Sequence, residues 1–373
     1  MRVSSTFRVL ASALLYLGAT SCSDDTSSGE TTVAPAVTSA SASAATASET
    51  TPQATSAATT TPSAPTTSRV STPTPTTSLA PAGSVTDEID IVPSPDWLEV
   101  DERGVWAKLD EGSVYLVDPG TNEVSAEIET GGDLCQGLGV GDGSVWSCAG
   151  PDVVRIDPAT NKVVATISLG KTYTQGELAV SEGKVWVLTG DGSSLVPIDA
   201  ATDTPGTPIM LPSRGTDLGA GPSGIWVVSS LDNVVMHVDP STGAVLSTTD
   251  VSAPADVAVD GDEVWVVGSA ETVRIDASSG AVTLTVPVGG GKEGGIALTE
   301  STVWLRSVKT FVTRIDRAAG EVIDDDKTAV YADIAARLTS GGDIVAGFGS
   351  IWTSAYDDGK LFRISAGEAD ASS

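Results

Sequence analysis

The stretch GKVWVLTGDGSSLVPIDAAT, residues 183–202, decides the fold because the chain repeats it with small changes. Forty residues earlier stands GSVWSCAGPDVVRIDPAT (143–160), and forty residues later SGIWVVSSLDNVVMHVDPST (223–242). A Trp follows Val or Ile in every copy, and the copies are 39 or 40 residues apart until the last step of 48. The repeat Trp residues are Trp106, Trp146, Trp186, Trp226, Trp265, Trp304 and Trp352. Such a period is typical of repeat architectures.

Each repeat contains four short segments with the features of strands. An alternating run such as ADVAV (255–259) is followed by a tight Gly/Asp turn, the Trp segment, VRID (273–276) and a fourth run such as KVVATISL (162–169). Alternation, β-branched residues and Gly-rich breaks all indicate strands. Four antiparallel strands repeated seven times predict an all-β fold, a seven-bladed β-propeller over residues 85–366.

The ring needs a closing strand. The seventh repeat ends at its third strand, LFRIS (361–365). We expect DEIDIV (87–92) to supply the missing fourth strand. Both ends of the domain would then pair in one sheet, which removes an open edge.

The turn between the third and fourth strands has its own pattern. Six repeats place an Asp at the end of the third strand, and four residues later a residue that tolerates positive φ. We expect these Asp side chains to accept hydrogen bonds from turn N–H groups. The Asp residues are Asp118, Asp157, Asp199, Asp239, Asp276 and Asp316; the later residues are Asn122, Asn161, Asp203, Gly243, Gly280 and Gly320.

The first part of the chain predicts export. Arg2 and Arg8 precede an apolar run from Val9 to Leu17 that is too short to span a bilayer, and small residues follow. We expect a lipoprotein signal over 1–21, ending in ATSC, with Cys22 lipidated; a plain secretory signal cleaved nearby is the alternative. The protein would then be anchored on the outer face of the bacterial cytoplasmic membrane, at the cell surface.

Two further segments lack the composition of a folded domain. Residues 22–84 are almost all Ser, Thr, Ala and Pro, which cannot bury enough apolar surface to fold. We expect a disordered stalk there, a candidate for O-glycosylation, and a disordered tail over 367–373.

The formal net charge of -29 at pH 7 limits the partners. Nucleic acid needs Lys and Arg for its phosphates, so it is excluded as a partner. The same charge argues against direct docking on anionic lipid, and the membrane would be reached only through the lipid anchor. We expect a soluble, monomeric extracellular domain.

The units VWVxx…VxRIDPxTNKVVATI resemble YVTN and NHL repeats of β-propellers, and within them the exported bacterial group that includes virginiamycin B lyase and YncE-like proteins. The resemblance covers about residues 87–365. For the lyase it implies a His general base on the top face with a nearby Glu and Mg²⁺. His237 is the only histidine and lies near a bottom turn, so the lyase activity is not carried over. IDPATNKVVA (156–165) also lacks the Trp of quinoprotein propellers, because Ala165 takes its place.

In propellers of this kind the innermost strand of each blade lines a central channel, and ligands usually bind at the end where these strands begin, here called the top face. That strand begins nine residues before each repeat Trp. Residues there and on the same loops form our candidate ligand or cation site: Trp97, Gln136, Glu177, Arg214, Asp217, Asp256, Lys292, Glu293 and Asp343. The clustered carboxylates require compensation. They either bond the backbone of the neighbouring blade, hold weakly bound Ca²⁺ or Mg²⁺, or serve a ligand or a reaction. No other cofactor is expected.

Cys135 and Cys148 flank the hairpin QGLGVGDGSVWS (136–147) and would lie opposite each other across it. Cross-strand positions bring the two Cβ atoms close enough for a disulfide, and an exported domain meets an oxidising environment. We expect a structural disulfide, with a redox role as the alternative.

The long last step places an insertion within GEVIDDDKTAVYADIAARLTSGGD (320–343), where DIAARL predicts one or two helical turns. We expect it on the fourth-to-first strand connection, overhanging the channel mouth, as decoration or as a binding loop. No catalytic residue is assigned. The sequence predicts a tethered, non-enzymatic binding module whose top face receives an unidentified protein, peptide or glycan. The alternative is a virginiamycin B lyase-like enzyme that uses a divalent metal and the top-face carboxylates.

Overall fold

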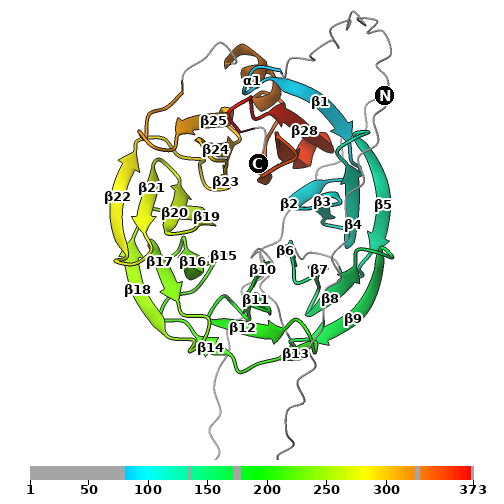
Figure 1. Ribbon diagram of the computed structural model, residues 1–373, viewed down its shortest axis with the longest axis vertical. Coiled ribbons are helices and arrows are strands. Elements are labelled where there is room, and N and C mark those ends of the chain that lie inside the picture. Colours follow the sequence, from blue (N-terminus) through cyan, green and yellow to red (C-terminus); the bar gives the residue numbers. More distant parts are fainter. Residues whose placement is uncertain (1–79, 133–135, 171–177, 324–327, 371–373) are drawn as a thin grey trace, which may run out of the picture. The chain divides into compact units, whose positions relative to one another are not determined.

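The computed structural model describes residues 80–132, 136–170, 178–323 and 328–370. Figure 1 shows seven small antiparallel sheets arranged as blades around a common axis, with the strands of each blade stacked from the axis outward. The predicted seven-bladed β-propeller is therefore confirmed. Within the described ranges, no helix is long and apolar enough to cross a membrane.

The first four blades follow the chain from the axis outward, starting with the strand nearest the axis. Blade 1 has β2 (Pro95–Asp101), β3 (Gly104–Leu109), β4 (Ser113–Asp118) and β5 (Glu123–Glu129). Blade 2 has β6 (Leu138–Gly141), β7 (Ser144–Ala149), β8 (Asp152–Asp157) and β9 (Lys162–Ser168). Blade 3 has β10 (Leu178–Ser181), β11 (Lys184–Thr189) and β12 (Ser194–Asp199), with two short outer strands, β13 (Thr204–Pro205) and β14 (Ile209–Met210). Blade 4 has β15 (Asp217–Gly221), β16 (Gly224–Ser229), β17 (Val234–Val238) and β18 (Val245–Asp250).

Blade 5 follows the same order, whereas blades 6 and 7 differ in how their outer side is completed. Blade 5 has β19 (Pro254–Asp260), β20 (Glu263–Gly268), β21 (Thr272–Asp276) and β22 (Ala281–Val286). Blade 6 has three strands, β23 (Gly295–Leu298), β24 (Thr302–Ser307) and β25 (Phe311–Asp316). Blade 7 has β26 (Ile344–Gly347), β27 (Ser350–Ala355) and β28 (Lys360–Ser365), and its outer strand is β1 (Val85–Asp90).

The ring closes as the sequence predicts. β1 pairs antiparallel with β28, with Ile89 opposite Leu361, so the third and fourth strands of the closing blade come from opposite ends of the domain. The strand starts two residues earlier than expected, at Val85. Gly83 N donates to Ser365 O at 2.8 Å and extends the contact beyond the strand.

The repeat Trp side chains form the interfaces between blades. All seven are 1 % exposed or less. Each packs against the next blade in the ring; Trp146 of blade 2, for example, lies in one apolar cluster with Leu178 and Ile198 of blade 3. The seven apolar clusters correspond to the seven interfaces, so the repeated Trp provides the large apolar surface that each blade buries against its neighbour.

The third strand places a cationic or aromatic residue over the Trp in five blades. In four of them the guanidinium carbon lies 4.7–5.7 Å from the Trp ring centroid, as cation–π contacts require, and the residues are Arg155, Arg274, Arg314 and Arg363. In blade 4 the ring of His237 stacks on Trp226 at 4.2 Å. Arg363 continues into blade 1, where its Nη1 donates to Pro119 O at 2.7 Å and to Asn122 Oδ1 at 2.8 Å. The same side chain thus covers the Trp and clamps the next blade.

The Asp residues that end the third strands cap their turns, as predicted. Asp118 Oδ1 accepts from Gly120 N at 2.7 Å and Asp316 Oδ1 accepts from Ala319 N at 2.7 Å, and the other four accept comparable bonds. The residues four positions later all have positive φ, between 54° and 71°. These Asp side chains are therefore engaged in turn structure on the bottom face.

The insertion in blade 6 replaces a strand. Among the described residues, no full strand pairs with the outer side of β25. An isolated bridge joins Ile315 to Val322 there, and α1 (Thr328–Ala335) packs against β25. Figure 1 shows α1 at the outer edge of the ring, beside β25 and β1. Tyr331 contacts Phe311 edge-on, and its hydroxyl donates to Gly83 O at 2.6 Å.

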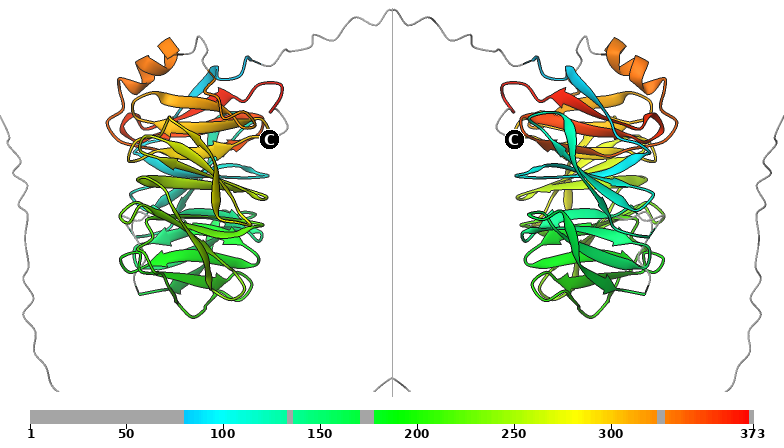
Figure 2. Two further views of the ribbon diagram at one scale, coloured as in Figure 1. Left: turned by 90° about the vertical axis from the view of Figure 1, so that its left-hand side faces the viewer. Right: turned by 90° about the vertical axis from the view of Figure 1, so that its right-hand side faces the viewer.

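The expected place of this insertion is corrected accordingly. The helical character of DIAARL is confirmed, but the helix covers the outer side of blade 6 and does not overhang the mouth (Figure 2). The added residues substitute for the fourth strand because their apolar side chains complete the interface between blades 6 and 7; these are Tyr331, Ile334, Ala335 and Leu338. Of the described part of the insertion, residues 340–343 line the cavity on the top face.

The interface model gives a stability prediction at the closing seam. Trp352 of blade 7 is fully buried against blade 1, so Trp352→Ala should lower the free energy of unfolding by about 3–5 kcal/mol. Val164→Ala, on the exposed side of β9, should change it by less than about 0.5 kcal/mol. Urea unfolding followed by Trp fluorescence measures both. A loss below about 1 kcal/mol for Trp352→Ala would contradict the role of the Trp.

Candidate functional site

A cavity of about 510 Å³ opens on the top face, where the innermost strands begin. Its lining comes from six blades, with blade 3 absent among the described residues. Of the nine residues predicted for this site, seven line the cavity: Trp97, Gln136, Asp217, Asp256, Lys292, Glu293 and Asp343. Four of them, Trp97, Asp217, Asp256 and Asp343, stand nine residues before a repeat Trp, and the other three lie on the same loops. The repeat position thus predicted side chains from distant parts of the chain that share one cavity.

The other two predicted residues do not join them. Arg214 is half exposed and turns away to blade 3, where its Nε donates to Asp191 O at 2.9 Å and lies 3.5 Å from the Asp191 carboxylate. Glu177 lies outside the described residues.

Two of the carboxylates tie neighbouring blades together. Asp343 of blade 7 accepts from Leu98 N of blade 1 at 2.8 Å and from Ile344 N in its own strand. Asp256 of blade 5 accepts from Ile296 N of blade 6 at 2.9 Å and from Val257 N. Of the three alternatives open from the sequence, backbone bonding across the seam is the one that these two residues show. Each uses both carboxylate oxygens for it.

Asp217 of blade 4 follows the same local pattern. It is 7 % exposed, and its Oδ1 accepts from Leu218 N at 2.8 Å. Backbone N–H donors suit a carboxylate in this setting because they stabilise its negative charge without introducing another side chain into the mouth.

Asp96 differs from Asp217, Asp256 and Asp343, whose carboxylates accept backbone N–H bonds. Its side chain is 6 % exposed and lines the cavity, and its Oδ2 accepts from Gln136 Nε2 at 2.6 Å across the seam between blades 1 and 2. Burial, together with the charges of Asp110 and Glu293, raises its pKa to about 7. Gln136 works in the opposite direction, but the net effect is a carboxyl group that titrates near neutral pH.

Loops between second and third strands add residues that the sequence argument missed. Asp110 follows β3, and its Oδ2 accepts from the hydroxyl of Tyr356, which follows β27, at 2.9 Å. Leu231, between β16 and β17, is 59 % exposed at the rim. A second strand runs antiparallel to the innermost strand and therefore ends at the top face. The first residue after each second strand was thus a signal in the sequence that could have identified Asp110 and Tyr356.

A metal centre finds no support in the described part of the chain. No group of three or more His, Cys, Asp or Glu side chains lies there in an arrangement able to hold a metal ion. Weak binding of Ca²⁺ or Mg²⁺ stays a prediction.

His237, the residue type that lyase chemistry needs, is far from the cavity. It is 7 % exposed in β17, stacked on Trp226, and its Nε2 lies 2.6 Å from Ser223 O. It is part of the interface between blades 4 and 5, where a substrate cannot reach it.

The predicted disulfide stays a prediction, because Cys135 lies outside the described residues. Cys148 is buried in β7, and its Sγ accepts from Gly137 N at 3.0 Å. Cys22 also lies outside the described residues.

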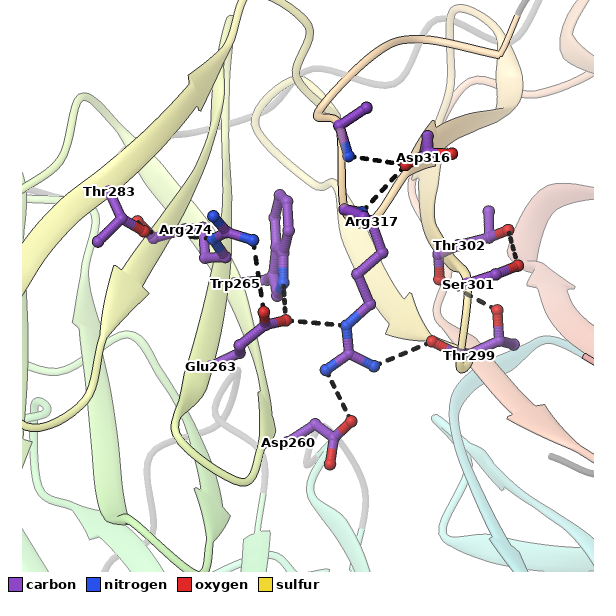
Figure 3. Close-up of polar contacts among 12 residues, drawn as sticks. Asp260, Glu263, Trp265, Arg274, Thr283, Thr299, Ser301, Thr302, Asp316 and Arg317 are labelled. Carbon is purple, nitrogen blue, oxygen red and sulfur yellow. Dashed lines mark hydrogen bonds and ion pairs between the residues drawn. The ribbon is translucent and has the colours of Figure 1, made fainter.

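A second, more open cavity of about 880 Å³ lies on the bottom face between blades 5 and 6. Figure 3 shows Arg317 at its centre, bound to Asp260 at 2.7 Å and Glu263 at 2.9 Å of blade 5, and to Thr299 O at 3.0 Å of blade 6. Its polar groups bond one another, so this cavity is a seam between blades and a weaker candidate for a binding site.

The chain returns to this region at its C-terminal end. Asp370 is 1 % exposed and accepts from Ser301 N at 2.8 Å and from Ser301 Oγ at 2.9 Å. Residues 367–370, which the sequence assigned to a disordered tail, are thus held against blade 6.

The comparisons with known proteins concern the fold. A family model described as "Outer membrane protein assembly factor BamB" matches residues 231–366. It covers less than half of the chain, so the likeness is to blades 4 to 7. A search of curated sequences found no significant match. Among solved structures, a computationally designed protein, Ika8, is 14 % identical with a TM-score of 0.56, covering 73 % of this chain and 83 % of its own. Identity that low shows the fold alone.

The raised pKa values predict how stability depends on pH. Burial raises the pKa of Glu99 to about 8 and of Asp256 to about 6, and that of Asp96 to about 7. A carboxyl group with a raised pKa binds its proton more tightly in the folded state, so the stability it gives is lost as pH rises through that pKa. The turn residue Asp239 has the opposite shift, to about 2, because side-chain and backbone donors hold its carboxylate, and its contribution is lost toward low pH. We therefore expect the melting temperature to rise from pH 8 to pH 5 and to fall again below about pH 4.

Differential scanning calorimetry from pH 3.5 to 8.5 measures this profile. Asp96→Asn should remove part of the slope between pH 6 and 8, while Asp87→Asn, on the outer strand β1, should leave it unchanged. A melting temperature that increases steadily from pH 5 to pH 8 would contradict the buried-carboxyl explanation.

Proposed function

We propose that this protein is a cell-surface binding module, whose propeller receives a partner polypeptide on the top face. The observation that carries the proposal is the 510 Å³ cavity, which is open to the surface, is built by six blades and contains both aromatic and acidic side chains. Among the described residues, no group of three or more His, Cys, Asp or Glu side chains is arranged to hold a metal ion.

The proposal also has support from the fold. Propellers present loops on a rigid ring, and the match over residues 231–366 is to a family described as an outer membrane protein assembly factor. We extend that name only to a class of role, namely interaction with another protein. Lipidation at Cys22 and a stalk over residues 22–84 would hold the propeller away from the outer face of the cytoplasmic membrane, where such a partner is met.

The lyase-like alternative has weaker support. It needs a general base near a bound metal on the top face, yet Asp256 and Asp343 commit their oxygens to backbone donors, and His237 is buried between blades.

Site-specific photo-cross-linking tests the proposed face. Leu231 at the cavity rim and Leu246 on the outer strand β18 belong to the same blade and are 59 % and 58 % exposed, so they form a matched pair. With p-benzoylphenylalanine at either position in the full-length protein in its own cells, a partner on the top face should be captured from position 231 and not from position 246.

Equal capture from both positions, or no adduct at position 231, would overturn the proposed binding face. Immunoblotting for equal protein levels and mass spectrometry of the adduct complete the experiment.

A further inference from the structure

The buried carboxylate of Asp96 identifies what the cavity binds. Asp96 is more than nine-tenths buried, lines the cavity, and has only the neutral amide of Gln136 as a side-chain partner. No Lys or Arg in the described ranges forms an ion pair with it; Lys292 on the same cavity is exposed. Burying a carboxylate without a cation costs free energy, and a folded protein retains such a group where a ligand supplies the missing charge.

A second carboxylate and two aromatic rings lie around the same space. Asp110 is close enough to raise the pKa of Asp96, and it is held in place by the hydroxyl of Tyr356. Trp97 lines the cavity next to them, and its indole Nε1 is buried without a partner among the described residues. Carboxylates with aromatic rings are the surroundings that organic cations prefer in proteins, because charge pairing and cation–π attraction act together.

The surroundings also select among cations. A divalent metal would need a cluster of ligands, which the described residues do not offer. An ammonium group carries three donors, enough to reach the carboxylates of Asp96 and Asp110 together. The ring of Trp97, which lines the same cavity, offers apolar surface to an aliphatic stem, which is how a lysine side chain is commonly buried.

We infer that the top-face cavity recognises a lysine side chain of the partner polypeptide, seating its ammonium group between Asp96 and Asp110. The inference rests on the proposed binding function and specifies its ligand. Asp96 and Asp110 supply the counter-charge, and Trp97 and Tyr356 surround the stem.

Calorimetric titration of the purified full chain tests the inference with three blocked tripeptides: Ac-Gly-Lys-Gly-NH₂, its norleucine analogue and its arginine analogue. The lysine peptide should bind saturably, at least about tenfold more tightly than the norleucine peptide, because charge-assisted hydrogen bonds are lost in the latter. It should also bind more tightly than the arginine peptide. Equal binding of lysine and norleucine, or tighter binding of arginine, overturns the inference.

Two variants separate the cavity from the general acidity of the protein. Asp96→Asn should weaken the lysine peptide by about tenfold or more. Glu129→Gln removes the same charge from the exposed outer strand β5 and should change the affinity by less than about twofold. Equal weakening by both variants would mean long-range attraction and would overturn the inference. Asp110→Asn, with its own melting curve, gives a second cavity variant in case Asp96→Asn does not fold.

A pH series supplies a readout that a structural role would not produce. Protonated Asp96 cannot pair with ammonium, so the affinity of the wild type should rise by about tenfold from pH 6 to pH 8, following a group with a pKa near 7. Asp110, Glu293, Lys292 and Tyr356 share the cavity, and so do Asp256 and Asp343, whose pKa values burial also raises, that of Asp256 to about 6. The buried Lys108 lies near Asp110, and burial lowers its pKa to about 8. The variant at Asp96 is therefore needed to assign the slope. Asp96→Asn should flatten the profile, and an unchanged slope in that variant would overturn the assignment. Cross-linking from position 231 does not require that the partner presents a lysine. If cross-linking captures a partner but the lysine peptide does not bind, the lysine inference is rejected and the proposed binding function stands.

Discussion

The buried Trp at each seam is the contact on which the rest of the structure depends. A four-stranded blade has two faces and cannot bury them alone, so each one places its Trp against the next blade, and the series is complete only when the last blade meets the first. That requirement explains why β1 crosses to blade 7 and why blade 6 can lose its fourth strand. A helix that fills the interface between blades 6 and 7 with Tyr331 and Ile334 meets the same need.

Ring closure has an electrostatic consequence at the axis. Seven innermost strands begin at one mouth, and carboxylates at the same repeat position are brought together there. Asp256 and Asp343 offset this repulsion because their carboxylates accept hydrogen bonds from backbone N–H groups of the following blade. Their charges therefore stabilise the contact between the two blades. Asp96 has the neighbouring charges without the backbone donors. Asp96 thus differs from Asp256 and Asp343 in the hydrogen-bond donors that the next blade presents to its carboxylate.

The sequence predicts the features that are decided locally or by counting. The Trp period, the turn Asp residues with their positive-φ partners, and the need for a closing strand all follow from patterns within one repeat, and the structure has them. Contacts that form only after closure could not be derived in this way. Tyr356 meets Asp110 across 246 residues, and Ile296 N reaches Asp256 only because adjacent blades are rotated into register. The predicted position of the helix α1 was wrong. The pattern of its residues indicates a helix, but it does not indicate that blade 6 lacks a fourth strand, whose place the helix takes.

Charge acts at two distances on this molecule. The net charge of -29 is spread over the chain and is screened beyond about 8–10 Å in physiological salt, so it can attract a basic partner and align its approach but cannot choose one group on it. Choice requires a desolvated charge with few competing partners, and Asp96 is such a charge on the described top face. An acidic surface with one under-compensated carboxylate at the base of a cavity therefore combines fast encounter with selection of a single cationic side chain.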